Sequence, residues 1–326
     1  MCCLHASHAA HVIALATLVT WTTACGDDAA SAPDGSPGSN GDGDGGGDGD
    51  GDGSGGDGDG DGLPEPPAIV SDEFDLDADV LRDGATGWSI LHPERASRVE
   101  IGGGALTVVG AAPDDGANWG WFQDDYGVLV HREVTGNFAA MVRLAVVDDL
   151  EPTEPPTGSF NAGGFVIRDA AGTHSGDENW VMYNMGSQGP TGYSREIKKT
   201  SSSQSGLYLN PQTFESTALL VCRIGSAFHF LHWDAEAAAW VPERFEPDVT
   251  QNSAHSWPEV DTSGESPMVF EHPGMPATLQ LGLMAHSYNA ADPDDTSGTR
   301  ATFEYLRMAG TPPETAEQCS DGFSAP

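Results

Sequence analysis

The chain has 326 residues, with 50 Asp and Glu against 13 Lys and Arg, which gives a formal net charge of −37. Such an excess of negative charge repels phosphate backbones and anionic lipid, so it excludes nucleic acid as a partner. The acidity instead favours solubility, divalent-cation binding or a neutral ligand such as a glycan.

The N-terminus has the layout of a secretory signal. An apolar run from Ala9 to Trp21 ends in Thr22-Thr23-Ala24-Cys25, which predicts a signal peptide over residues 1–25 and a lipidated Cys25. The run is too short to cross a bilayer core. A lipoprotein signal usually has Leu where Thr22 stands, so an ordinary cleaved signal is the alternative. We expect an outer-membrane or cell-surface lipoprotein that touches the membrane only through this anchor, or otherwise a secreted protein.

Residues 26–67 predict a disordered linker. They contain 11 Asp, one Glu and no Lys or Arg, and residues 41–62 are almost wholly Gly and Asp. Alternating Asp resembles the start of an EF-hand loop, but the stretch has no Glu at the twelfth position and no apolar residue to fix a loop. The stretch therefore predicts a self-repelling spacer, with an end-to-end distance of about 35 Å.

The rest of the chain alternates apolar and polar residues in short runs that are separated by Gly, Pro, Asn and Asp. Strands are predicted at 88–91, 98–101, 105–109, 128–133, 138–146, 164–168, 180–185, 193–198, 219–224, 228–233, 279–284 and 300–307. No long amphipathic helix is apparent, and 235–239 is typical of a hairpin turn. The fold class is therefore all-β: an antiparallel two-sheet jelly-roll sandwich over residues 68–309, followed by a flexible tail over 310–326.

Cysteine usage leaves one pairing open. Cys2 and Cys3 leave with the signal, and Cys222 shares a strand face with apolar neighbours, so it is predicted to be a small buried hydrophobic residue. A disulfide between Cys222 and Cys319 is the alternative, since an exported protein permits it.

An ordered set of motifs resembles a bacterial family of unassigned function in the concanavalin A-like lectin/glucanase superfamily, which has a laminin G-like jelly roll. The resemblance covers about residues 72–309. Its motifs are the segments 134–138, 163–168, 178–181, 220–224, 228–233 and 281–285, together with Trp240. The resemblance implies a lectin-like jelly roll and little about chemistry, because this fold carries binders, enzymes and passive modules.

Glu259, Asp261 and Glu265 are the candidate catalytic residues. Retaining glucanases on this fold carry two Glu flanking an Asp on one strand, and their chemistry needs two carboxyl groups about 5–5.5 Å apart. Here the three residues fall in turn-like sequence within a long insertion, which favours an acidic surface loop. Whether the chain is an enzyme stays open, and we expect that it is not.

Aromatic residues beside carboxylates form a candidate glycan platform. Neighbouring glycines, Gly116 and Gly120, would leave the indole faces of Trp119 and Trp121 open to a sugar ring. The predicted ligand-binding residues are Trp119, Trp121, Asp124, Asp125, Tyr126, Tyr193 and Trp257. Core packing is the alternative role for such residues.

No cofactor is expected, with a structural calcium ion as the alternative. Asp292, Asp294 and Asp295 supply clustered oxygen ligands, although solvated acidic loops are the preferred explanation for them. The histidines show no metal-binding spacing. The leading hypothesis is thus a monomeric, exported, non-enzymatic β-sandwich that binds polysaccharide or cell-surface glycan. The alternatives are a glycoside hydrolase using Glu259 and Glu265, and a passive envelope or adhesion module with protein partners.

Overall fold

The computed structural model describes residues 71–80, 86–111, 119–188, 192–214, 216–250, 252, 257–289 and 298–326. The predicted signal peptide, Cys25 and the Gly/Asp linker lie outside these residues. Within them, no helix has the length and apolar character needed to cross a membrane.

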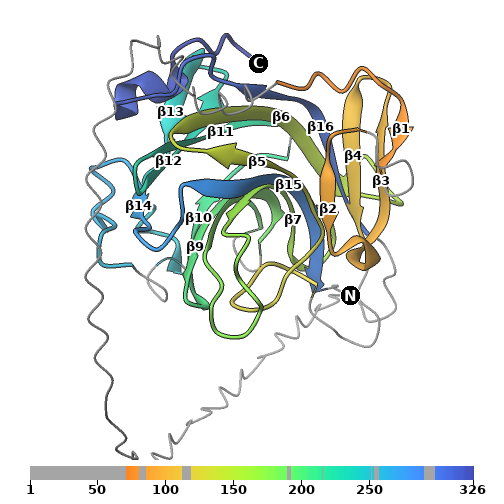
Figure 1. Cartoon of the computed structure of the whole chain (residues 1–326), viewed down its shortest axis with the longest axis horizontal. Helices are drawn as coiled ribbons and strands as arrows, with labels where there is room; N and C mark the ends of the chain where they lie inside the picture. Colours follow the sequence, from red (N-terminus) through yellow and green to blue (C-terminus); the bar gives the residue numbers. More distant parts are fainter. Residues whose placement is uncertain are drawn as a thin grey trace, which may run out of the picture. The chain divides into compact units, whose positions relative to one another are not determined.

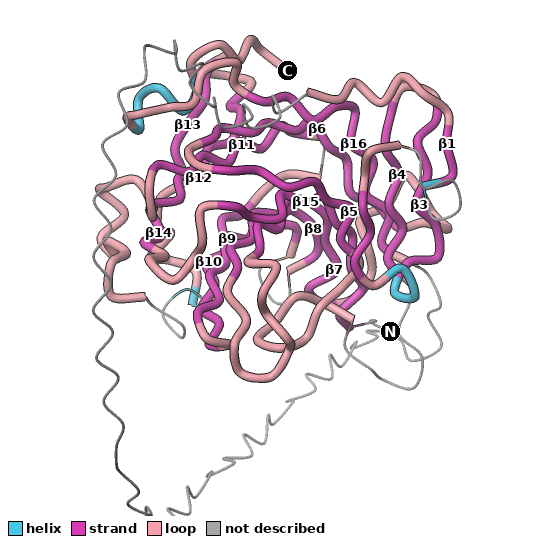
Figure 2. The backbone as a smooth tube through the Cα atoms, viewed as in Figure 1, coloured by secondary structure: helices cyan, strands magenta, loops and turns pink. Residues whose placement is uncertain are grey.

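Two antiparallel sheets form a sandwich, as the sequence predicts (Figure 1). The larger sheet has, in spatial order, β1 (Ala78–Asp79), β3 (Ala96–Gly102), β4 (Ala105–Gly110), β16 (Thr299–Met308), β6 (Phe138–Asp148), β11 (Thr217–Ile224), β12 (Ala227–Asp234) and β13 (Ala239–Pro242), with β14 (Val269–Glu271) also paired to β12. The smaller has β10 (Gln204–Pro211), β9 (Tyr193–Ser201), β8 (Trp180–Ser187), β7 (Ser159–Arg168), β15 (Thr278–Asn289), β5 (Leu129–Thr135) and β2 (Ser89–Leu91). The 3-10 helices η1 (Pro93–Arg95) and η5 (Ala316–Ser320) are single short turns (Figure 2).

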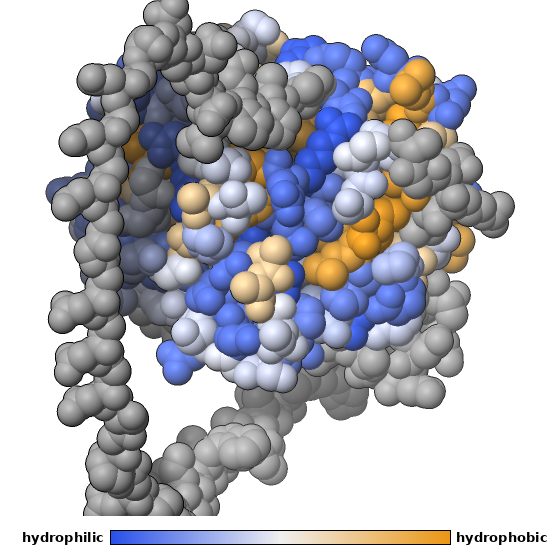
Figure 3. All heavy atoms as spheres, viewed as in Figure 1, coloured by the Kyte–Doolittle hydropathy of each residue, from blue (hydrophilic) through white to orange (hydrophobic). Residues whose placement is uncertain are grey.

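The main core lies between the sheets and follows the predicted alternation. On β6, Phe138, Val142 and Leu144 point into it, and on β15 so do Leu279 and Leu283. Burial of these side chains drives the association of the sheets. The molecular face in Figure 3 is mostly hydrophilic, in keeping with the acidic composition.

Each predicted strand range overlaps an observed strand, and residues 235–238 form the predicted turn. The sequence pattern did not predict β10, because Gly206 and Pro211 weaken the alternation expected of a strand. Pro is tolerated there because β10 is an edge strand of its sheet. It also missed β14, a short strand within the insertion that reads as turn sequence.

Residues 310–326, predicted to be a flexible tail, carry η5 and a disulfide from Cys319 to Cys222. Cys222 is fully buried, as predicted, but the preferred interpretation of an unpaired residue is wrong. Both cysteines belong to a small apolar cluster on the face of the nine-stranded sheet away from the core. Its other buried members are Ala139, Met141, Leu220, Leu231 and Tyr305. The disulfide therefore fastens the C-terminal segment over this face.

A buried carboxylate, Glu243, follows β13 and is 1% exposed. It accepts hydrogen bonds from Arg195 Nε (2.5 Å), Asn210 Nδ2 (2.5 Å) and the Tyr183 hydroxyl, and His232 Nδ1 lies 3.1 Å away. Burial alone would raise the pKa of Glu243, but the charge of Arg195 and the hydrogen bonds from His232 and Arg195 outweigh burial and lower it. Glu243 is therefore ionised, and it joins the insertion to the seven-stranded sheet.

Removal of the disulfide should destabilise the sandwich. The bond closes a loop with a sequence separation of 97, and the double substitution Cys222→Ala/Cys319→Ala should lower the free energy of unfolding by about 2–5 kcal/mol. Denaturant titration measures this loss. Reductant should lower the stability of the wild type to that of the double variant and leave the stability of the variant unchanged. A wild type whose thiols titrate as reduced, yet whose stability is unaltered, contradicts the prediction.

Glu243→Gln should lower the free energy of unfolding at pH 7 by about 3–5 kcal/mol, because Arg195 then stays buried without a counter-charge. The folded-state pKa of Glu243 is lowered, so its stabilisation is complete above the unfolded pKa of about 4.3 and is lost as the pH falls below it. The difference in the free energy of unfolding between wild type and Glu243→Gln should therefore become smaller in acid. Glu236→Gln, at an exposed turn position, is the matched control and should change little. A difference in the free energy of unfolding that grows in acid contradicts the prediction.

Candidate functional site

The segment 119–127 lies on the face of the seven-stranded sheet that points away from the core, called the outer face below. Trp121 is 1% exposed and packs edge-on against Trp180 of β8, with ring centroids 5.9 Å apart. Around this pair lies an apolar cluster with side chains from β5, β7, β8 and β15: Leu129, Val166, Met182 and Met284. The segment is therefore a roof over part of the sheet.

Two glycines allow the roof to approach the sheet closely. A Cβ atom at Gly120 would lie 2.5 Å from Tyr288 Cδ2, and one at Gly127 would lie 3.0 Å from His286 Cβ. The sequence analysis expected glycines to leave the indole of Trp121 open to a ligand. That expectation is wrong, because the glycines instead let the backbone settle onto β15 and bury the ring.

Backbone hydrogen bonds fix the roof in place. Lys198 Nζ on β9 donates to the carbonyl of Trp121 (2.9 Å), and the amide of Trp121 donates to His286 Nδ1 (3.4 Å). The amide of Gln123 donates to Ser205 Oγ (2.8 Å). The roof is thus tied to β9, β10 and β15 at once.

A pocket of about 190 Å³ lies between the roof and the sheet. Its lining residues come from the roof and from the outer faces of β7, β9, β10 and β15: Trp121, Phe122, Phe160, Lys198, Leu207, His286 and Tyr288. The rings of Phe122, Phe160 and Tyr288 are half-buried, so they offer apolar surface to an occupant.

A chain of buried polar side chains leads from the pocket across the outer face. Lys198 Nζ lies 2.7 Å from Glu196 Oε1, and Glu196 Oε2 accepts a hydrogen bond from Asn184 Nδ2 (3.0 Å). Asn184 Oδ1 in turn accepts from Gln188 Nε2 (2.8 Å). All four are at most 3% exposed. Lys198 and Glu196 are therefore a buried ion pair, and Lys198 brings a charged group to the pocket wall.

His286 is neutral in this setting. Burial is the main cause that lowers its pKa to about 3, and the neighbouring positive charge of Lys198 lowers it further. In the part of the pocket wall that the structure describes, Lys198 is thus the one cation, and Glu196 balances its charge.

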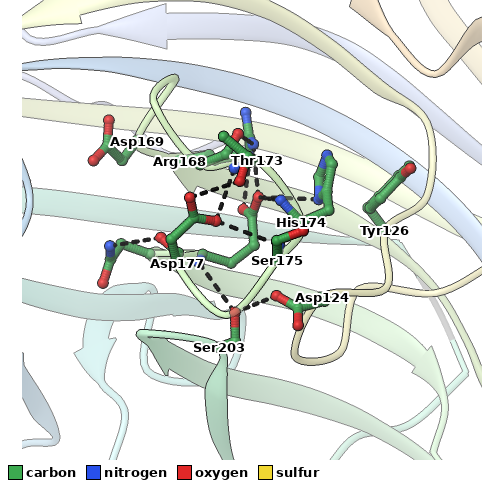
Figure 4. A network of polar contacts seen from close by, with 12 residues as sticks. Asp124, Tyr126, Arg168, Asp169, Thr173, His174, Ser175, Asp177 and Ser203 are labelled. Atoms are coloured by element: carbon green, nitrogen blue, oxygen red, sulfur yellow. Dashed lines mark hydrogen bonds and ion pairs between the residues drawn. The ribbon is translucent and has the colours of Figure 1, made fainter. Parts of the chain in front are cut away.

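A network of polar contacts ties the roof to the β7–β8 loop (Figure 4). Arg168 donates to both oxygens of Glu178 at 2.9 Å, and His174 Nδ1 lies 3.0 Å from Glu178 Oε1. From the roof, Asp124 accepts hydrogen bonds from the amide of Gly176 (3.1 Å) and from the Ser203 hydroxyl.

Tyr126 completes this contact between the roof and its neighbours. Its ring centroid lies 3.7 Å from that of His92 and 3.6 Å from that of His174, and the Arg95 guanidinium lies 4.2 Å above it. Burial is the largest cause that lowers the pKa of both histidines. Because their imidazoles are uncharged, His92 and His174 can pack on the Tyr126 ring without repelling the Arg95 cation.

Backbone strain is concentrated around the roof. Of eight non-glycine residues with positive φ in the described ranges, six lie in the roof or in segments that contact it or line the pocket: His92, Gln123, Phe160, His174, Ser202 and Ser203. Such conformations cost on the order of 1–3 kcal/mol each and are typical of functional sites, where the surrounding contacts impose them.

The structure distributes the predicted ligand-binding residues over several places. Trp121 lines the pocket but is itself 1% exposed, while Asp124 and Tyr126 hold the roof. Asp125 is exposed on the roof, and Trp119 is half-buried at its start. Tyr193 and Trp257 lie on the core side of β9, where the Tyr193 hydroxyl donates to the Val146 carbonyl and Trp257 packs on Lys199. These two residues are therefore separated from the pocket by the sheet.

The three candidate catalytic residues lie in loops after β13. Glu259 forms an ion pair with Lys199. Asp261 accepts hydrogen bonds from the Ser263 hydroxyl (2.7 Å) and from the amides of Ser263 (3.0 Å) and Ser266 (3.0 Å). These bonds shape its own turn and lower its pKa to about 2, with the Ser263 hydroxyl as the largest cause. Glu265 is exposed. The turn-like reading of this stretch is thus confirmed, and the motif does not occupy a sheet strand.

Asp292, Asp294 and Asp295, the calcium candidates, fall outside the described residues. Within those residues, no group of three or more His, Cys, Asp or Glu side chains could hold a metal ion.

The sequence did not identify Phe160, Lys198, Leu207, His286 or Tyr288 as pocket residues. Its alternation already placed Lys198 opposite Ile197 on a strand, hence on the face away from the core. The sequence pattern could not predict that β9, β15 and the roof lie side by side, because that contact depends on the order of the strands in the sheet.

No family model matches the chain, and no curated protein matches it. Solved structures resemble it with TM-scores below 0.5. A functionally unknown protein from Saccharomyces cerevisiae has a TM-score of 0.45 and 12% identity, over 70% of this chain and 97% of its own. The GH43 BlXynB protein of Bacillus licheniformis has 0.46 and 14%, over 74% of this chain and 39% of its own. An immunostimulatory antigen and pseudo β-1,3-glucanase of Mycobacterium tuberculosis has 0.41 and 13%, over 75% of this chain and 99% of its own.

Proposed function

We propose that this chain is a non-enzymatic β-sandwich that binds a polysaccharide or a cell-surface glycan in the pocket beneath the roof. The observation that carries the proposal is the composition of that pocket. Three half-buried rings, from Phe122, Phe160 and Tyr288, surround a space into which a buried lysine brings polar donors.

This combination suits a sugar. A pyranose has an apolar C–H face that packs on an aromatic ring, and an edge of hydroxyl groups that needs hydrogen-bond partners. Ligand sites of this kind combine a mostly apolar lining with a few fixed polar groups. Lys198 is such a group, because the ion pair with Glu196 and the bond to the Trp121 carbonyl fix its position.

Hydrolysis by Glu259 and Glu265 is the less favoured alternative. A retaining mechanism needs one carboxylate free to attack the sugar and a second that carries a proton. Glu259 is engaged by Lys199 on the core side of β9, and Glu265 lies exposed on a turn. If no glycan binds, the interpretation that is left is a passive envelope or adhesion module with protein partners.

We further propose that the protein is exported and anchored through Cys25. The Cys222–Cys319 disulfide supports export, because structural disulfides persist in oxidising compartments and are rare in the cytosol. The Gly/Asp linker would then hold the sandwich away from the membrane.

A glycan array probed with the purified protein should show binding to at least one class of polysaccharide. Phe122→Ala and Tyr288→Ala should each weaken that binding by at least about tenfold, because each removes a ring that lines the pocket. Trp233→Ala, in β12 of the other sheet, is the aromatic control and should leave binding unchanged. An array with no bound glycan, or release of reducing sugar that Glu259→Gln abolishes, contradicts the proposal.

Cys25→Ala should release the protein from membranes. The wild type should incorporate labelled palmitate and sediment with the membrane fraction, whereas the variant should do neither, since the anchor is the acylated cysteine. Cys319→Ala serves as the control for loss of an unrelated cysteine. Membrane association that survives Cys25→Ala overturns the anchor assignment.

A further inference from the structure

We infer that the pocket selects uncharged sugar residues and rejects uronates, and that the Lys198–Glu196 ion pair sets this preference. The inference rests on the proposed function and names the class of ligand. It follows from the charges and hydrogen-bonding groups around the pocket.

Among the described residues that line the pocket, the only cation already has its counter-charge. Lys198 is 3% exposed, and its ammonium lies 2.7 Å from Glu196 Oε1. Glu196 is fully buried, and its other oxygen is held by Asn184. The other basic residue in the lining, His286, is neutral because burial and the Lys198 charge hold its pKa near 3.

A ligand carboxylate would therefore enter a buried site that offers it no uncompensated positive charge. Burying an ionised carboxylate without such a partner is costly. It would also approach Glu196, which carries the same charge, across the shared lysine. The chain as a whole, with its net charge of −37, repels an acidic polysaccharide before contact.

A hydroxyl group meets the opposite situation. An ammonium has three N–H donors; Lys198 donates one to the Trp121 carbonyl, and its charge is paired with Glu196 Oε1 at 2.7 Å. A sugar hydroxyl can accept one of the remaining N–H groups, while the ring packs on Phe122, whose centroid lies 5.6 Å from Lys198 Nζ. The volume of about 190 Å³ is below the range of drug-sized ligand sites and suits one sugar ring.

The test measures binding of paired ligands to the full chain by isothermal titration calorimetry. Each pair consists of a neutral hexose oligosaccharide and its C6-oxidised uronate counterpart, with the same length and linkage. The wild type should bind the neutral member at least about tenfold more tightly. Glu196→Gln keeps the side-chain volume and leaves Lys198 unbalanced, so it should reverse the preference toward the uronate.

Glu259→Gln is the matched control, because it removes the carboxylate paired with Lys199 on the opposite face of the same strand. It should leave the preference of the wild type unchanged. Circular dichroism and the melting temperature establish whether each variant is folded. If Glu196→Gln does not fold, the wild type alone still shows whether the pocket prefers the neutral sugar to the uronate.

Each outcome separates the two proposals. A wild type that binds uronates as tightly as neutral sugars, or more tightly, overturns the inference and leaves the proposed function standing. A folded Glu196→Gln that keeps the wild-type preference overturns the role of the ion pair. A wild type that binds no sugar of either kind overturns the proposed function and the inference together.

Discussion

The central strands of the seven-stranded sheet are buried on both faces, and the other features of the site follow from this constraint. Almost every residue of β7, β8 and β9 is inaccessible to solvent. On β9, Arg195 and Lys199 point to one side of the sheet, and Glu196 and Lys198 point to the other. A buried charge without a partner would destabilise the fold, so both faces need counter-charges.

The core side obtains its counter-charges from the insertion after β13. Glu243 pairs with Arg195, and Glu259 pairs with Lys199. This long segment, which has little regular structure, is therefore held against the sheet by ion pairs as well as by apolar contacts. This use of Glu259 as a counter-charge explains why its carboxylate is paired, whereas a glucanase would need a free carboxylate.

The outer side obtains its cover from the roof. Trp121 closes the apolar part of the face, and Lys198 ties the roof backbone to β9. Gly120 and Gly127 permit the close approach that this cover needs. Because the roof covers only part of the face, a pocket remains at its edge, where rings and the buried ion pair meet.

The disulfide has a comparable role on the opposite sheet. Cys319 brings η5 onto the face of the nine-stranded sheet that carries Cys222 and Leu220. A C-terminal segment with little apolar surface of its own is thus held in place by a covalent bond. Each sheet of the sandwich has its outward face partly covered, one by the roof and the other by the tail.

The sequence by itself determined the all-β class, most of the strand positions and the core faces, because alternation of apolar residues is a local property of each strand. It also placed Cys222 on a buried face and Glu259, Asp261 and Glu265 in turn sequence. The tertiary structure alone decided that Cys222 pairs with Cys319, that Trp121 is buried, and that Lys198, His286 and Tyr288 share one pocket. These facts depend on which strands are neighbours and on how closely a loop can approach a sheet, and neither is encoded in any single stretch of the chain.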